Sequence, residues 1–500
     1  MSKFISLLVG LFALPFAGCE TLAVDADPGR TEVSRSAIEL RVMTFNIEWG
    51  GDNIDFDNVI EAIRKSRADI VGIQEPLGNL GRLATALNWY SDELTYVISK
   101  YPLLTPPAAN GYYVFAEVSP DKVVAVANVH LPSDPDGMGM VRDGATAAEV
   151  LAIERATRLP KIQPYLGMLE PLIQRGMPVY LSGDFNAPAH TDWTAETVGD
   201  RPFLRYPLTW PVSFVTAEAG LRDSYREIYP DPKLNPGLTW WARRPPLELY
   251  SPNENDPEER IDFLWHAGSS TTISSEIVGE KNFPGVTISV EPWPSDHRGV
   301  VSLFSVLPAD VPPLVSSRRR VHRIGDEIEI SYRQAANSRI RITRYGEKQN
   351  SILVTEEKLS GSGQLTFATN DLPAGRYIAT MSAPLRQNVN CEFWILQKNA
   401  VPDVSLAGTE FNAGESIGVS WRNGPGYRND YLSVVKVGSD SDYSGGSAWL
   451  YINALPAGRI NLDASTVAAG WPIEPGNYVV RLIEDDGREV LAESAPFIIH

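Results

Sequence analysis

Six short segments in the first 300 residues carry acids, amides or histidines beside apolar runs. In the most informative one, Ser182-Gly-Asp-Phe-Asn186, a carboxylate and an amide lie two residues apart. Residues two apart on a strand point to the same face, so we expect Asp184 and Asn186 to share a face at a sheet edge. Such a pair could position water and a metal ion, as metal-assisted phosphoester cleavage requires. The other segments could supply the remaining groups: VMTFNIE (42–48), IVGIQEP (70–76), VANVHLP (126–132), RIDFLWH (260–266) and WPSDHRG (293–299).

Alternating strands and helices must position these segments. Apolar residues at helical spacing predict a helix over 55–67, with Asp55 or Asp57 as its N-cap. Residues 145–174 are helical in pattern, but three prolines must interrupt that helix. Strands are predicted at 40–45, 70–74, 112–118, 123–129, 179–181, 261–265 and 299–304. Mixed strands and helices with adjacent hairpins favour two sheets flanked by helices.

Length and composition limit the possible classes of protein. A chain of 500 residues is too long for one core, so we expect two to four domains. The hydrophobic share of 43% and charged share of 21% are those of ordinary globular proteins. The net charge of −18 argues against a binder of long nucleic acid, because phosphate contacts require a basic surface.

The N-terminus is typical of an exported protein. Lys3 precedes the apolar run 4–16, which is too short to span a bilayer and suits a signal peptide. Phe16-Ala-Gly-Cys19 resembles a bacterial lipobox, so we predict a lipoprotein signal peptide over 1–19 with Cys19 as the lipidation site. Residues 20–37 would be a flexible tether. This predicts an extracytoplasmic, membrane-anchored lipoprotein, or a secreted protein if the lipobox is not used. Cys391 would then have no disulfide partner.

The sequence changes character after the last chemical segment. Residues 306–318 read as a proline-rich linker. Beyond it, 324–333 resembles 413–422, and both repeats continue as alternating strands with Gly and Pro turns. We predict two all-β sandwich modules, 319–398 and 401–500, without catalytic residues. A glycan or another cell-surface ligand is a candidate partner for them.

In their order along the chain, the six segments resemble the endonuclease/exonuclease/phosphatase superfamily, and the match covers 38–305. The resemblance implies a four-layered α/β sandwich, with two central sheets flanked by helices, as the catalytic domain. The two C-terminal modules resemble the immunoglobulin-like modules of secreted phosphoesterases.

The resemblance also implies a divalent metal ion, Mg²⁺ or Mn²⁺. Glu75 is the strongest candidate ligand, because it ends an apolar strand where a carboxylate would otherwise have no role. Asn46 would orient Glu75 or a phosphate oxygen, and Asp296 would reach the metal region. Hard divalent cations prefer such oxygen ligands.

Five further residues match catalytic positions of the superfamily. Asp184 would orient or deprotonate the attacking water, and Asn186 would hold that water or the phosphate. Asp262 and His297 would form a carboxylate–imidazole pair, with His297 either a charged phosphate contact or a neutral base. His130 would donate to phosphate and act as acid for the leaving oxygen.

Three functions are compatible with these residues. The first is a metal-dependent hydrolase that cleaves phosphoesters, preferentially phosphodiesters, outside the cytoplasm by activated-water attack. Its substrate could be a phospholipid headgroup or another small phosphoester. The second is a nuclease acting on DNA or RNA within the same superfamily. The third is a catalytically silent surface binding protein.

Overall fold

The computed structural model describes most of the chain after residue 35. The described residues are 36–106, 109–247, 255–346, 352–383, 387–439, 448–467, 470–487 and 489–500. The predicted signal peptide, Cys19 and nearly all of the predicted tether lie outside them. No helix among the described residues is long and apolar enough to cross a membrane.

The first central sheet, sheet A, contains the strands of the segments 42–48 and 70–76. Its strands in order are β12 (Val286–Ser289), β11 (Ser270–Gly279), β13 (Gly299–Val306), β1 (Ile38–Asn46), β2 (Ile70–Gln74), β4 (Val97–Ser99) and β3 (Tyr90–Asp92). Its outer face packs against α1 (Phe56–Ser66) and α2 (Leu80–Leu87). Asp55 caps α1 by accepting a hydrogen bond from the backbone N–H of Asp57, which fixes where this helix begins.

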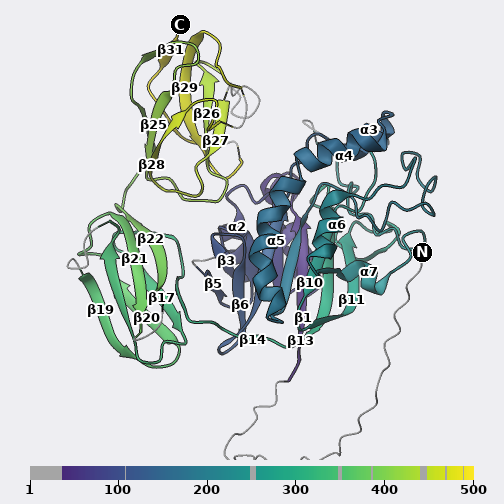
Figure 1. Cartoon of the computed structure of the whole chain (residues 1–500), viewed down its shortest axis with the longest axis horizontal. Helices are drawn as coiled ribbons and strands as arrows, with labels where there is room; N and C mark the ends of the chain where they lie inside the picture. Colours follow the sequence, from purple (N-terminus) through teal and green to yellow (C-terminus); the bar gives the residue numbers. More distant parts are fainter. Residues whose placement is uncertain are drawn as a thin grey trace, which may run out of the picture. The chain divides into compact units, whose positions relative to one another are not determined.

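The second central sheet, sheet B, lies against the first. Its strands in order are β5 (Leu103–Leu104), β6 (Val114–Ser119), β7 (Lys122–His130), β8 (Val179–Asp184), β10 (Asp262–Ala267) and β9 (Arg222–Asp223), and β14 (Ala309–Asp310) also pairs with β7. An apolar core that includes Leu40, Val126 and Leu264 fills the space between the sheets. The outer face packs against α5 (Leu159–Gln174) and α6 (Pro211–Glu218), as Figure 1 shows. The predicted four-layered sandwich is therefore confirmed.

The predicted interruption of the helical region 145–174 is correct in part. The helix breaks once, between α4 (Ala147–Ala156) and α5, and Pro160 lies in the first turn of α5. Pro164 and Pro171 lie inside α5 without ending it. Ile162 and Leu169 on this helix are buried against sheet B, and we attribute its continuity to that packing. The two short helices α3 (Gly137–Arg142) and α7 (Ser224–Ile228) complete the domain.

The described residues after 313 form strands and loops, as predicted, and build two β-sandwiches with separate cores. The first pairs a sheet of β15 (Leu314–Ser317), β17 (Glu327–Arg333) and β20 (Gly363–Ala368) with a sheet of β16 (Val321–Arg323), β22 (Val389–Leu396), β21 (Gly375–Ser382), β18 (Ser338–Arg344) and β19 (Ile352–Leu359). The second pairs β23 (Asp403–Leu406), β25 (Ile417–Arg422) and β28 (Gly458–Leu462) with β24 (Glu410–Phe411), β31 (Phe497–Ile499), β29 (Gly476–Ile483), β26 (Tyr431–Lys436), β27 (Ala448–Tyr451) and β30 (Val490–Glu493).

The predicted linker 306–318 contains regular structure. Strand β14 extends sheet B of the catalytic domain, and β15 belongs to the first sandwich. The segment thus contributes a strand to each of the two domains that it joins.

Candidate active site

The strands that carry the predicted residues bring them to one edge of the two central sheets. In sheet A, Asn46 at the end of β1 pairs with Gln74 at the end of the parallel strand β2. In sheet B, the parallel strands β7 and β8 end at the paired residues His130 and Asp184. The antiparallel strand β10 begins at Asp262, opposite Asp184. Residues far apart in the sequence therefore meet at the same edge.

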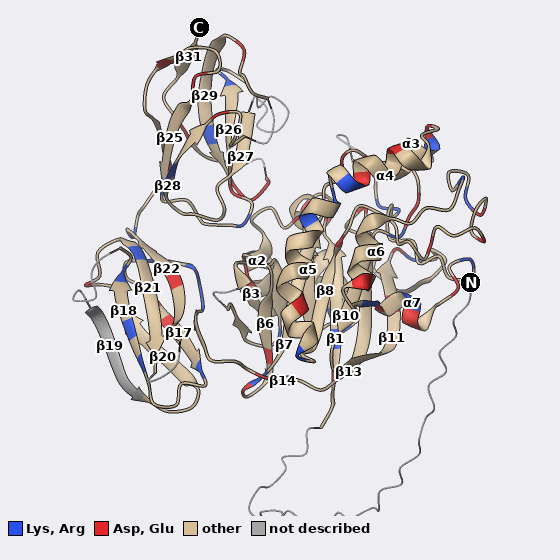
Figure 2. Cartoon of the chain, viewed as in Figure 1, with Lys and Arg blue, Asp and Glu red and all other residues tan. Residues whose placement is uncertain are grey.

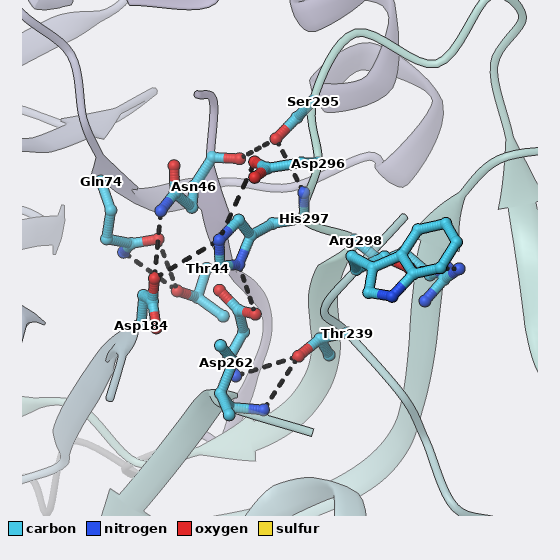
Figure 3. A network of polar contacts seen from close by, with 12 residues as sticks. Thr44, Asn46, Gln74, Asp184, Thr239, Asp262, Ser295, Asp296, His297 and Arg298 are labelled. Atoms are coloured by element: carbon cyan, nitrogen blue, oxygen red, sulfur yellow. Dashed lines mark hydrogen bonds and ion pairs between the residues drawn. The ribbon is translucent and has the colours of Figure 1, made fainter. Parts of the chain in front are cut away.

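The Ser295-Asp-His297 turn joins this edge just before β13. The Ser295 hydroxyl donates a hydrogen bond to the backbone oxygen of Asn46 (2.7 Å). The same hydroxyl accepts one from the backbone N–H of His297 (3.0 Å). Ser295 is buried and fixes His297 relative to β1, as Figure 3 shows.

Asn46 connects the acids of the two sheets. Its Nδ2 donates hydrogen bonds to Oε1 of Glu75 (3.0 Å) and Oδ2 of Asp184 (3.1 Å). Glu75 Oε2 also accepts a hydrogen bond from the backbone N–H of Trp49 (2.9 Å). His130 lies across from both acids, with Nε2 3.8 Å from Glu75 Oε1 and 3.6 Å from Asp184 Oδ2. The His130 side chain is 35% exposed, so it can face a substrate.

His297 lies among three carboxylates. Its Nδ1 is 3.0 Å from Asp262 Oδ2. On the other side of the ring, Nε2 is 3.6 Å from Asp184 Oδ2 and 3.9 Å from Asp296 Oδ1. Burial alone would lower the pKa of His297, but Asp262, Asp184 and Asp296 together raise it well above its usual value. The charged imidazolium is therefore the favoured form at neutral pH.

The pKa values of the acids around His297 are also shifted. Burial raises the pKa of Asp184, and the charge of His297 opposes that rise. Burial also raises the pKa of Asp296, again opposed by His297, while Glu75 adds to the rise. Perturbed acids gathered around one imidazole are typical of a functional site.

Thr239 holds the backbone at Asp262 in place, a role that sequence reasoning did not predict. Its hydroxyl accepts hydrogen bonds from the backbone N–H groups of Ile261 (3.0 Å) and Asp262 (3.1 Å). These contacts fix the first residue of β10. The residue type alone predicted no such role for Thr239.

Asn186 does not share a strand face with Asp184, contrary to the period-two prediction. Strand β8 ends at Asp184, and Asn186 has a left-handed backbone (φ 47°). Its backbone N–H donates to Asp184 Oδ1 (2.9 Å), which is an Asx turn. Its Nδ2 donates to the backbone oxygen of Leu131 (2.9 Å), one residue after His130. Asn186 thus ties the loop after His130 to Asp184.

Glu48 and Arg244 form a buried ion pair beside Asp296. Arg244 donates to Glu48 through Nε and Nη2, both at 2.5 Å, and the two side chains are 3% and 2% exposed. Glu48 Oε2 also accepts a hydrogen bond from the backbone N–H of Asp296 (3.0 Å). Burial and the neighbouring Asp296 raise the pKa of Glu48 to about 7, although Arg244 opposes the rise. Arg244 is therefore a buried residue of the site and not a solvated surface residue.

Two other histidines of the domain make different contacts. His190 packs edge-on against Phe214, and its Nδ1 lies 3.0 Å from the hydroxyl of Ser213. His266 is buried inside β10, with Nε2 2.6 Å from Glu227 Oε2. Both contacts are those of structural residues.

The donor set fits a hard divalent cation. Asp184, Asp262 and His297 each offer a ligand atom, and these atoms lie within 4.8 Å of one another. The buried Oδ1 of Asp262 has no hydrogen-bond partner among the described residues. The bond between His297 and Asp262 would compete with an ion at this group. Glu75 and Asp296 offer further oxygen ligands close by.

Several known proteins resemble about half of this chain or more. A protein of Caenorhabditis elegans described as uncharacterized is 26% identical over 260 residues, which are 46% of this chain and 79% of that protein. A solved endonuclease/exonuclease/phosphatase from Beutenbergia cavernae is 17% identical over 71% of this chain and 99% of its own, with a TM-score of 0.33. TDP2 of D. rerio in complex with a single-strand DNA product is 14% identical over 54% and 99%, with a TM-score of 0.32.

The family model described as the endonuclease/exonuclease/phosphatase family matches residues 43–297, just over half of the chain. The match begins in β1 and ends at His297, so it spans the site from its first strand to its imidazole. The chain belongs to the endonuclease/exonuclease/phosphatase family.

Proposed function

We propose that this protein is a divalent-metal-dependent phosphoesterase that cleaves small phosphodiesters by activated-water attack, outside the cytoplasm. The observation that carries the proposal is the position of His297, buried among Asp184, Asp262 and Asp296 with His130 across the same site. This arrangement places an acid, a base and a fixed positive charge around one point, as phosphoryl transfer requires.

The side chains divide the reaction as follows. Asp184 accepts a proton from the attacking water as the new oxygen–phosphorus bond forms, and its raised pKa makes it a stronger base. His297, as imidazolium, contacts a phosphoryl oxygen while negative charge grows there. His130 donates a proton to the leaving oxygen as its bond to phosphorus breaks.

Glu75 and Asp296 would hold the divalent cation, Mg²⁺ or Mn²⁺, with Asn46 orienting Glu75. When bound, the ion neutralises charge on the phosphoryl oxygens. Carboxylates so close to one another repel, and a bound cation relieves that repulsion.

Hydrolysis of bis-p-nitrophenyl phosphate by the purified chain tests the proposal. We expect turnover with Mg²⁺ or Mn²⁺, its loss with a chelator and its recovery when the metal is restored. Turnover that ignores the chelator would contradict a metal-dependent site. Absence of turnover on every phosphoester tried would support the alternative, a catalytically silent binding protein.

A substrate panel separates the candidate substrates. It should include sphingomyelin, inositol phosphates, nucleotides, DNA and RNA. The net charge of −18 favours small phosphoesters over long polyanions. Figure 2 shows acidic and basic residues interspersed along the catalytic elements. Preferential cleavage of DNA or RNA would instead favour the nuclease alternative.

The proposed location rests on Cys19, which we propose is lipidated and anchors the chain to a membrane. Two or three acyl chains on one cysteine would give stable attachment. Cys19→Ser should move the protein from the membrane fraction to the soluble fraction. Continued membrane association of that variant would contradict the anchor.

We also propose that the two sandwich modules bind a glycan or another cell-surface ligand and keep the enzyme near its substrate. Pull-down of immobilised cell-wall glycans by the full chain tests this. Loss of binding after removal of 316–500 would support it, and unchanged binding would contradict it.

A further inference from the structure

The carboxylate of Glu48 lies with Glu75 and Asp296 in one acidic group at the proposed metal site. Asp296 and Glu75 both raise the pKa of Glu48, after burial, and Glu75 also raises the pKa of Asp296. Three acids that are buried or partly buried repel one another, because little water reaches them to screen their charges. Positive charge close to them is needed to offset that repulsion. The chain supplies part of that charge itself, through Arg244.

Arg244 holds Glu48 in the two-pronged geometry that suits a carboxylate. Its Nε and Nη2 contact Glu48 Oε2 and Oε1, each at 2.5 Å. Glu48 Oε2 accepts a further hydrogen bond from the backbone N–H of Asp296. Both oxygens of Glu48 are therefore engaged, and a metal ion would have to displace the guanidinium to use them.

The guanidinium also acts on the neighbouring acid. Burial and Asp296 raise the pKa of Glu48, and Arg244 opposes that rise. Burial also raises the pKa of Asp296, where Arg244 adds to the larger lowering by His297, as a cation near carboxylates does. Its Nη1 donates to the backbone oxygen of Pro245 (3.0 Å). The Nε–Nη2 edge of the guanidinium, which could otherwise bind a phosphate, donates its hydrogen bonds to Glu48.

We propose that Arg244 is a built-in cation that takes the place of a second metal ion on Glu48, so that the site binds one divalent ion. The inference rests on the proposed function, because it concerns the metal centre of that same site. Its consequence is specific: removing the charge of Arg244 frees Glu48, and Glu48 with Asp296 then binds a second ion.

Counting bound Mn²⁺ tests this without any substrate. Electron paramagnetic resonance measures free Mn²⁺ during titration of the full chain, at about pH 8 so that carboxylate ligands stay ionised. We expect about one equivalent for the wild-type chain and about two for Arg244→Met. The double variant Glu48→Gln/Arg244→Met should return to about one, because the ligand of the second ion is gone.

Two matched variants serve as controls. Arg243→Met removes the neighbouring arginine, whose side chain is 57% exposed and paired with Glu258, and it should bind as the wild type does. Arg244→Lys keeps the charge and should also bind about one equivalent. A thermal unfolding curve for each variant identifies any that does not fold. If Arg244→Met does not fold, Arg244→Gln takes its place, because it also removes the charge and should bind about two equivalents.

Each outcome decides the question. One equivalent for both the wild type and Arg244→Met would overturn the inference and leave the proposed function standing. Two equivalents for the wild type, or for the double variant, would also overturn it, because Glu48 would not be the ligand that Arg244 blocks. No binding by the wild type would contradict the proposed metal centre, and the inference with it.

Discussion

Nδ1 of His297 lies 3.0 Å from Oδ2 of Asp262, and both side chains are buried. This contact links the start of β10 to the turn before β13 and sets the charge state of the imidazole. Burial lowers the pKa of His297, and among the groups that raise this pKa Asp262 contributes most. Asp262 therefore governs the pH range in which His297 stays positive.

Asp262→Asn should shift the pH dependence of turnover. Charged His297 supports turnover below its pKa, and this support is lost as pH rises through that pKa. Without the Asp262 charge the pKa of His297 falls, so the loss should begin at lower pH. A pH–rate profile measures the shift. Glu227→Gln, which alters the contact of His266 elsewhere on β10, should leave the profile in place, and an unshifted profile for Asp262→Asn would contradict this role.

Glu75→Gln should raise the metal concentration needed for half-maximal turnover before it lowers the maximum. A neutral amide is a weaker ligand for a hard cation than a carboxylate. A Mg²⁺ titration of turnover provides the measurement, with Glu61→Gln on the exposed side of α1 as the control. Identical titration curves for Glu75→Gln and the wild type would remove Glu75 from the metal site.

His130→Gln should lower the rate of cleavage most for substrates with poor leaving groups. If His130 protonates the leaving oxygen, its loss should cost about 100-fold or more for an alkyl leaving group. The loss should be much smaller for p-nitrophenolate, which leaves without a proton. Rates on a methyl and a p-nitrophenyl ester of the same phosphate give the comparison, and equal losses on both would exclude the acid role.

Asn186→Ala should act through the loop after His130. The change removes the hydrogen bond to the Leu131 oxygen and places a less suitable residue at φ 47°. The expected cost is about 1–3 kcal/mol of unfolding free energy, together with a higher KM. Denaturant unfolding and steady-state kinetics measure both effects. A large fall in kcat at unchanged stability would instead place Asn186 on the substrate.

Much of this fold could be predicted because apolar runs that end in polar residues identify strands and their functional ends. Asn46, Glu75, His130 and Asp184 each follow such a run, and the structure brings all four together. The β-rich texture and internal repeat after 318 likewise predicted the two sandwiches. Their strands alternate buried and partly buried residues, as in β21.

Contacts that depend on tertiary packing could not be predicted in this way. Arg244 meets Glu48 across 196 positions, and its sequence neighbours gave no sign that it is buried. The continuity of α5 through Pro164 and Pro171 depends on packing against sheet B. Asn186 left the expected face because β8 ends at Asp184, and strand ends are the least predictable part of a pattern.

Turnover of bis-p-nitrophenyl phosphate by His297→Ala and Asp184→Asn, at saturating Mg²⁺, is the sharpest test of the proposed active site. The control is Ser213→Ala, which alters a hydroxyl that contacts His190 outside the cluster. We expect each site variant to lose at least about 100-fold in kcat while remaining folded, and the control to keep its rate. Near wild-type turnover in either folded site variant would contradict the assignment of this cluster as the catalytic centre.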